Sequence, residues 1–198
     1  MLRYFALELC DASLDRLFLK GVEQEKYRGP RLQDMPLPQN VFSQLAEGMA
    51  YIHEKGITHR DVKPYNALIH VRKRLEQKHQ VIFKWADFGG SKKVNITGEC
   101  SMSGFKFTTN WCAPEVLKIY EQSSQSNRIT ERYGTDGTIQ SDVFSEGLVF
   151  IYYLLKGEHP YGNHFYNKHK LKEGDSINLE SKVSLCYLKQ FFQQHNYC

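Results

Sequence analysis

Long apolar runs are missing from this sequence of 198 residues. The most apolar stretch, Leu148 to Leu155, is far shorter than the ~20 residues that a membrane-spanning helix needs. The N-terminus also lacks a basic region followed by an apolar one, so we expect neither a signal peptide nor a membrane segment in this chain. A chain of this length can bury roughly 70% of its unfolded surface and can therefore form a substantial core.

Paired cysteines and a strong charge of one sign are missing as well. The cysteines form no C-x-x-C pair and their number is odd: Cys10, Cys100, Cys112, Cys186 and Cys198. This pattern predicts reduced, intracellular thiols rather than a disulfide framework. The formal net charge of +4 is too small to predict direct nucleic-acid binding by this chain.

Reactive side chains are concentrated between His59 and Asn66. Asp61 supplies a carboxylate, Lys63 an ammonium group and Asn66 an amide, while Pro64 stiffens the middle of the stretch. Together these groups can accept a proton from a hydroxyl, hold a phosphate and help to ligate a cation.

A zinc site at the neighbouring His53 and Glu54 is excluded. The H-E-x-x-H motif places its second histidine one helical turn after the first. Here the next histidine is His59, which lies beyond Gly56, so the two imidazoles cannot share one helical face.

Three short motifs follow one another in a fixed order. The stretch at 59–66 matches the pattern H-R-D-L-x-x-x-N except that Val62 replaces the leucine, and D-F-G at 87–89 and A-P-E at 113–115 follow it. Any one triplet alone is a weak signal, but the three in this order resemble the C-terminal lobe of eukaryotic protein kinases. We therefore identify the chain as a member of that family on its motifs.

The resemblance implies a fold and a domain organisation. We expect an α+β, mainly α-helical fold: a protein-kinase-like C-terminal lobe with the N-lobe essentially absent, because the sequence shows no Gly-rich loop and no V-A-I-K lysine. Residues 1–198 would form a single partial kinase domain, in which 4–162 are the C-lobe with its hinge and 163–198 are unassigned. For lack of those N-lobe groups, we expect this chain alone to be inactive.

The resemblance also assigns catalytic and metal-binding roles. Asp61 would accept or orient the substrate hydroxyl proton, Lys63 would neutralise charge on the transferring phosphoryl group, and Thr108 would brace both side chains. Asn66 and Asp87 would hold the Mg²⁺ ions that bridge the phosphates of ATP. ATP and Mg²⁺ are thus the expected cofactors.

For the adenine ring, the resemblance points to the N-terminal residues and one strand. Leu7 would be the gatekeeper, the backbone of Glu8 and Cys10 would hydrogen-bond the adenine edge, and Leu68 would lie beneath the ring. From the sequence alone, the run from Tyr4 to Leu9 is equally consistent with any buried strand.

Four further residues have regulatory or structural roles by resemblance. Arg60 would pair with a phosphate on Ser101 or Ser103, although for either serine a plain polar loop is an equally good interpretation. Glu115 usually pairs with a later arginine, but no arginine follows Arg132, so Glu115 is either solvated or part of an incomplete lobe. Asp142 would hold the backbone of the 59–66 stretch.

Periodicity predicts the elements that carry these residues. Apolar residues at helical spacing predict a helix over 39–54 that stops before Gly56. Residues 67–71 and 81–86 read as a strand pair that lets Asn66 and Asp87 converge on one cation, joined by a basic segment that is a solvated loop or, less simply, a binding patch. The stretch 148–155 predicts a helix buried on every side, and 20–38 reads as loop.

Within the kinases, Glu8-Leu9-Cys10, the stretch 145–150 and His159-Pro160-Tyr161-Gly162 resemble the inositol-requiring endoplasmic-reticulum stress sensors, which couple a serine/threonine kinase to an RNA-cleaving domain. This implies transfer of the ATP γ-phosphoryl group to protein hydroxyls, in the cytoplasm or, as part of a longer protein, at the cytosolic side of the endoplasmic-reticulum membrane. Expected partners are ATP, a protein substrate and a second copy of the chain. The alternative is a non-catalytic kinase-like module, or pseudokinase, that senses nucleotides or mediates interactions.

Overall fold

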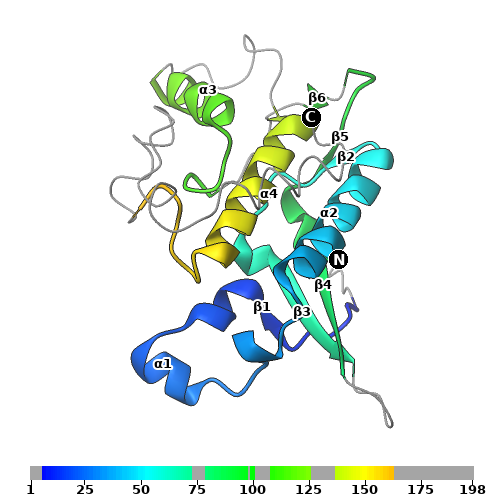
Figure 1. Cartoon of the computed structure of the whole chain (residues 1–198). Helices are drawn as coiled ribbons and strands as arrows, with labels where there is room; N and C mark the ends of the chain where they lie inside the picture. Colours follow the sequence, from blue (N-terminus) through cyan, green and yellow to red (C-terminus); the bar gives the residue numbers. More distant parts are fainter. Residues whose placement is uncertain (1–5, 73–78, 98, 101–107, 126–136, 163–198) are drawn as a thin grey trace.

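The structure is a computed structural model of the chain, and it describes residues 6–72, 79–97, 99–100, 108–125 and 137–162. Two long helices, α2 (Pro38–Glu54) and α4 (Ile139–Leu154), lie side by side through the middle of the molecule (Figure 1). The hairpin of β3 (Ala67–Arg72) and β4 (Gln80–Trp85) packs against α2, and α3 (Pro114–Gln125) lies near α4 on the other side.

Short elements connect these parts. They are β1 (Ala12–Ser13), the 3₁₀ turn η1 (Leu14–Phe18), α1 (Gly21–Lys26), η2 (Leu32–Asp34), β2 (Ile57–Thr58), η3 (Pro64–Asn66), η4 (Phe88–Gly90), β5 (Lys92–Lys93), β6 (Glu99–Cys100) and β7 (Gly137–Thr138). Strands β2 and β5 pair with each other, as do β6 and β7. Among the helices of the described chain, none has both the length and the apolar character needed to cross a membrane.

Helix α2 forms where the apolar spacing predicts it. Pro38 occupies its first turn, where a missing N–H costs no hydrogen bond. One face is buried: Val41, Phe42, Leu45, Ala46, Met49 and Ile52. The chain then leaves the helix through Gly56, whose φ of +67° is readily available only to glycine.

Helix α4 is the central, largely buried helix, as its apolar sequence predicts. At its start the Oγ1 of Thr138 accepts a hydrogen bond from the backbone N–H of Ser141 at 3.2 Å, and the Ser141 hydroxyl in turn accepts one from the N–H of Thr138. At its end Gly157 has a φ of +90°, and a Cβ there would lie 2.4 Å from the Cβ of Phe18. Only glycine fits this turn.

The sheet has the order β1-β3-β4 and is antiparallel throughout. Because side chains alternate along a strand, Ile69 and Phe83, which are direct partners, both point into the core against α2. Gln44 of α2 binds the outer edge of β4: its Oε1 accepts from the N–H of Phe83 at 2.9 Å, and its Nε2 donates to the oxygen of Val81 at 3.4 Å. Sheet and helix are thus held together by both apolar and polar contacts.

Aromatic rings join α2 to α4. Phe42 stacks on Phe150 with ring centroids 4.5 Å apart, and Tyr153 meets Phe42 edge-on at 5.8 Å. Both phenylalanines are essentially inaccessible to solvent. This contact fixes α4 beneath the loop that follows α2.

The structure corrects the expected fold class. We expected a mainly α-helical C-terminal lobe with the N-lobe essentially absent. Instead, the N-terminal part of the described chain joins an antiparallel sheet packed on α2 in an N-lobe-like layer, and because the described residues end at 162, much of the expected C-terminal lobe lies outside them. The physical reason is that an isolated hairpin is only marginally stable, so β3 and β4 recruit β1 and a helix to cover them.

The expected strand at 4–9 also differs. Residues 6–10 have no regular secondary structure, and residues 1–5 lie outside the described residues. The strand forms later, at Ala12–Ser13, where the chain pairs with Ile69 and Leu68 of β3.

Candidate active site

Asp61 is the centre of the candidate site, in the loop between β2 and η3. Its Oδ2 accepts from the Nζ of Lys63 at 2.7 Å and from the Nδ2 of Asn66 at 3.1 Å, and its Oδ1 accepts from the hydroxyl of Thr108 at 3.1 Å. The Lys63 ammonium also donates to Thr108, at 2.9 Å. The carboxylate is therefore held in one orientation by three donors, one of them cationic, while 15% of its side-chain surface stays open to solvent.

Asp142 of α4 fixes the backbone of this loop. Its two oxygens accept from the backbone N–H groups of His59 at 2.7 Å and Arg60 at 2.8 Å, and Oδ2 also meets the Nε2 of His53 at 3.1 Å. Arg60 has a φ of +71°, in the left-handed region that non-glycine residues rarely adopt. The buried carboxylate of Asp142 stabilises this unfavourable backbone conformation. It thereby helps to orient the next residue, Asp61.

The imidazole of His59 joins the loop to the segment that carries Asp87. Its Nδ1 accepts from the backbone N–H of Asp61 at 3.3 Å, so its proton is on Nε2, which donates to the oxygen of Ala86 at 3.0 Å. Its ring lies 4.9 Å from that of Phe88. Burial lowers the pKa of His59 and keeps the ring neutral.

Asn66 and Asp87 lie at the open end of the β3–β4 hairpin. The N–H of Ala86 donates to the oxygen of Asn66 at 2.9 Å, just beyond the last strand pair, Ala67 with Trp85. Asp87 follows directly, exposed to solvent, with a φ of +64° and its Oδ1 accepting from the N–H of Gly89 at 3.3 Å. The structure thus brings these two predicted ligands to the same end of the hairpin.

The donor set fits Mg²⁺ in chemistry. Asp87 offers a carboxylate and Asn66 an amide oxygen, both hard ligands of the kind Mg²⁺ prefers, and the ion commonly takes only one or two protein ligands with substrate phosphates. The nitrogen of the Asn66 amide donates to Asp61, so the oxygen is the end that faces away from that carboxylate. Within the described ranges, no group of three or more His, Cys, Asp or Glu side chains gathers to hold a metal by itself.

The residues predicted to contact adenine are only partly brought together. Leu68 is half-buried on β3, with Ser13 and Lys84 as its strand partners. The Glu8 carboxylate accepts a hydrogen bond from Lys84, which lowers the pKa of Glu8, so the N-terminal segment does reach this part of the sheet. Leu7, however, is 87% exposed, which does not fit a gatekeeper that packs against the adenine ring.

Cys10 and Glu115 have simpler surroundings. Cys10 is a free, half-buried thiol, and burial raises its pKa. Glu115, in the first turn of α3, is exposed, so of the two situations considered for it the structure has the solvated one. Ser101 and Ser103 lie outside the described residues, whereas the backbone of Arg60 is held by Asp142 and its side chain is buried.

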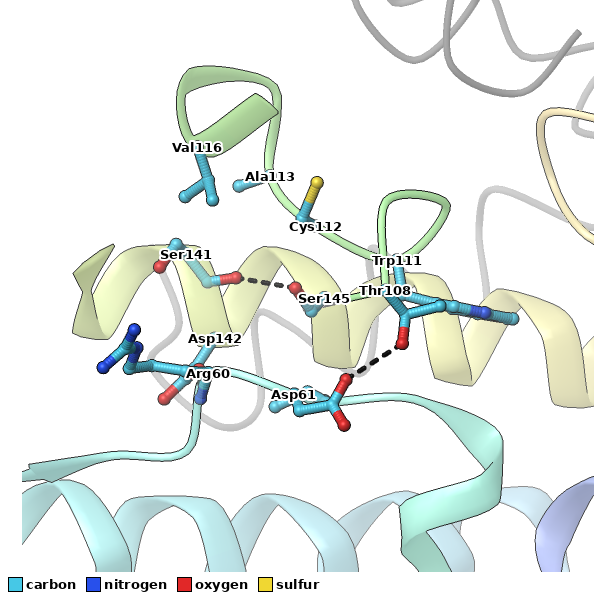
Figure 2. A pocket seen from close by; sticks show the side chains of 11 residues that line it. Arg60, Asp61, Thr108, Trp111, Cys112, Ala113, Val116, Ser141, Asp142 and Ser145 are labelled. Atoms are coloured by element: carbon cyan, nitrogen blue, oxygen red, sulfur yellow. Dashed lines mark hydrogen bonds between the residues drawn. The ribbon is translucent and has the colours of Figure 1, made fainter. Parts of the chain in front are cut away.

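A small pocket lies beside Asp61 and Thr108 (Figure 2). Trp111, Cys112 and Ser145 line it, and no role at a site had been predicted for any of the three. Its volume of about 20 Å³ is room for one water-sized group and far too little for a nucleotide.

His159 positions the loop segment that carries Thr108. Its Nε2 meets the oxygen of Asn110 at 2.8 Å, and its ring lies edge-on to Trp111 at 4.6 Å. The N–H of Trp111 donates to the oxygen of Thr108 at 2.9 Å. His159 and Asn110 are 49 residues apart in the sequence, so the motif at 159–162 did not predict this contact.

Comparisons with known proteins agree with one another. A family model described as the protein kinase domain matches residues 3–195. The serine/threonine-protein kinase/endoribonuclease IRE2 of Homo sapiens is 35% identical over 186 residues, covering 91% of this chain and 17% of the relative. The serine/threonine-protein kinase/endoribonuclease ire-1 of Caenorhabditis elegans is 32% identical over 178 residues, covering 87% and 16%.

Among solved structures, the yeast RNA Pol II CTD kinase CTDK-1 complex matches with a TM-score of 0.54 and 23% identity, covering 84% of this chain and 43% of that chain. This likeness concerns the fold alone. The chain spans about one sixth of the length of the two kinase/endoribonuclease relatives.

Proposed function

The chain belongs to the protein kinase domain family, and from this premise we propose that it carries the phosphoryl-transfer residues of a serine/threonine protein kinase. The substrates would be ATP, used with Mg²⁺, and the hydroxyl group of a protein serine or threonine. The observation that supports this most strongly is the set of hydrogen bonds that Asp61 accepts, which leaves its carboxylate fixed and accessible beside Thr108.

Asp61 would orient the substrate hydroxyl and accept its proton. General-base assistance of this kind is worth about 10²–10⁴ in rate, provided that the base is within hydrogen-bond reach of the proton it takes. Thr108 and Asn66 keep the carboxylate aimed at one position, and Asp142 keeps the loop itself in place.

Lys63 would act on the phosphoryl group rather than on the hydroxyl. Its ammonium lies 2.7 Å from Asp61 and 2.9 Å from the Thr108 hydroxyl, so a phosphoryl oxygen that approached Asp61 would come close to this positive charge. The lysine would offset the negative charge of the three phosphoryl oxygens during transfer.

Asn66 and Asp87 would hold the metal–nucleotide complex. Mg²⁺, when bound with ATP, neutralises charge on the β- and γ-phosphates. Asp87 would contribute its carboxylate and Asn66 its amide oxygen, at the open end of the hairpin. Leu68, and the backbone of Glu8 and Cys10, would contact the adenine ring from the same sheet.

The second candidate function is a non-catalytic kinase-like module. The exposure of Leu7, at 87%, favours it, because a gatekeeper that faces solvent does not close a nucleotide pocket. Such a module would bind a second copy of the chain or another protein. We propose that either function belongs to the unfolded-protein response, by likeness to a sensor for unfolded proteins in the ER of Schizosaccharomyces pombe. Its place would be the cytoplasm or, as part of a longer protein, the cytosolic side of the endoplasmic-reticulum membrane.

Transfer of labelled γ-phosphate distinguishes the two functions. We propose to measure it in a chimaera that places the N-terminal lobe of the human relative ahead of Leu7. Asp61→Asn is expected to abolish transfer, whereas the matched variant Asp34→Asn, at an exposed capping carboxylate, is expected to retain it. Equal transfer by the two variants would exclude Asp61 as the base, and no transfer by the unmutated chimaera would favour the module.

A further inference from the structure

Glu146 is a buried carboxyl group that the proposed chemistry does not use. It lies in the middle of α4, is 2% exposed, and its Oε1 has no hydrogen-bond partner. Glutamate is almost never buried unless it is paired, and a buried polar atom without a partner needs an explanation.

The nearest charged group on the same helix is Asp142, one turn earlier. Residues four apart on a helix are neighbours on one face. Asp142 is also 2% exposed, and its carboxylate oxygens accept hydrogen bonds from the backbone N–H groups of His59 and Arg60. Two carboxylates this close in a buried setting cannot both ionise without strong repulsion, so one of them keeps its proton.

Glu146 is the one that keeps the proton. Burial, and secondarily the charge of Asp142, raise the pKa of Glu146 to about 8. The indole N–H of Trp85 on β4 partly opposes this effect, but its hydrogen bond goes to the oxygen of Leu45 at 2.9 Å. The other titratable or charged groups near Asp142 are His53 of α2, His59 and Arg60 of the loop, and Cys100 of β6.

We propose that Glu146 is a positioning residue that acts through Asp142. While Glu146 is a neutral carboxylic acid, Asp142 holds the loop at His59 and Arg60; release of the loop admits water to α4 and lets Glu146 ionise. Proton loss and loop release are therefore coupled, and the loop is held more tightly at low pH than at high pH. This coupling does not require that the chain transfer phosphate.

Linkage gives the size and the direction of the effect. A carboxyl group with a raised pKa in the closed state and an ordinary one, near 4.5, in the open state favours opening about tenfold more for each unit of pH between the two values. The contribution of Glu146 to the protection of the loop should be greatest below the lower value, whereas His59 opposes it below pH 6.5. The contribution of Glu146 should fall as the pH rises and level off above about 8.

The experiment is hydrogen–deuterium exchange on the full chain between pH 5.5 and 9, read at the backbone amides of His59 and Arg60 and corrected for intrinsic exchange rates. In the unmutated chain, the protection of these amides is expected to fall about tenfold per pH unit between pH 6.5 and about pH 8, above the range in which protonation of His59 on opening has the opposite effect. Glu146→Gln should remove this dependence, whereas the matched variant Glu47→Gln, at an exposed position of α2, should keep it.

The amide of Leu45, in the buried face of α2, separates loop release from unfolding of the whole chain. If Leu45 shows the same protection and the same pH dependence as His59, the effect is global and the proposal is wrong. If Glu146→Gln does not fold, the ¹³C carboxyl resonance of Glu146 in the unmutated chain decides. Titration near 8 supports the proposal, and titration near 4.5 overturns it.

Discussion

Replacement of Asp142 by alanine tests how the loop that carries Asp61 is held. The variant leaves two buried backbone N–H groups, those of His59 and Arg60, without their acceptor. Each unsatisfied buried group costs about 1–3 kcal/mol, so the pair costs roughly 2–6 kcal/mol. If the loop is released from α4, Arg60 can leave the left-handed region of backbone conformation. This relief of backbone strain offsets about 1–2 kcal/mol of the loss in stability. We therefore expect Asp142→Ala to lower the free energy of unfolding by about 3 kcal/mol.

Urea denaturation of the full chain, followed by tryptophan fluorescence, measures this loss. Gln140→Ala is the matched control, because Gln140 is an exposed residue in the first turn of the same helix and its replacement should change stability by no more than ~0.5 kcal/mol. If Asp142→Ala were no less stable than Gln140→Ala, the backbone N–H groups would have other acceptors, and the account of the loop given above would be refuted.

Three further predictions concern the parts that surround the site. Gln44→Ala should lower the free energy of unfolding by about 1–2 kcal/mol in the same denaturation assay, because both hydrogen bonds to the edge of β4 are lost; an unchanged midpoint would show that this edge needs no clamp. Phe42→Ala should cost ~3–5 kcal/mol, since it leaves a cavity against Phe150; a loss below ~1 kcal/mol would mean that the two helices do not depend on this stack. Because burial lowers the pKa of His59 below its ordinary 6.5, the stability that this ring contributes is present above pH 6.5 and is lost as the pH falls below that value; His59→Gln should reduce the slope of stability against pH between 5 and 6.5, and an equal slope would contradict the neutral, buried ring.

The long elements could be predicted from the sequence because one physical pattern decides each of them. Apolar residues at helical spacing give α2 within one residue of its observed start, and short apolar runs give both strands of the hairpin within one residue. The apolar stretch in α4 is buried only in part, because Ile151, Tyr152 and Leu154 are half-buried rather than buried on every side. These elements are amphipathic or wholly apolar, so the local sequence alone predicts which side faces the core.

Other parts could not be predicted, because their structure depends on distant contacts. The glycines and prolines of 20–38 predicted loop, yet α1 and η2 form there; no residue of α1 is buried, so no apolar periodicity marked it. The strand expected before residue 10 forms instead at β1, since pairing with β3 decides its position. The fold class was wrong for the same reason: a local pattern does not tell which strands will gather into one sheet.

The candidate site shows the same division. The motifs placed Asp61, Lys63, Thr108 and Asn66 in one set, and the structure brings these four together, although their chemical roles remain predictions. His53 and His159 were missed as supports, because each acts through a contact dozens of residues away. Glu146 lies in the stretch 145–150 that carried the subfamily resemblance, but its burial was not predicted.

The central claim is that Asn66 and Asp87 share one metal–nucleotide ligand at the open end of the hairpin. Mn²⁺, a paramagnetic substitute for Mg²⁺, can be added to the ¹⁵N-labelled chain together with a non-hydrolysable ATP analogue. The account predicts that the side-chain amide signal of Asn66 and the backbone signal of Asp87 broaden together, and that Asp87→Asn prevents the broadening at Asn66. Broadening confined to exposed carboxylates elsewhere, such as Glu115, with both of these signals unchanged, would contradict it.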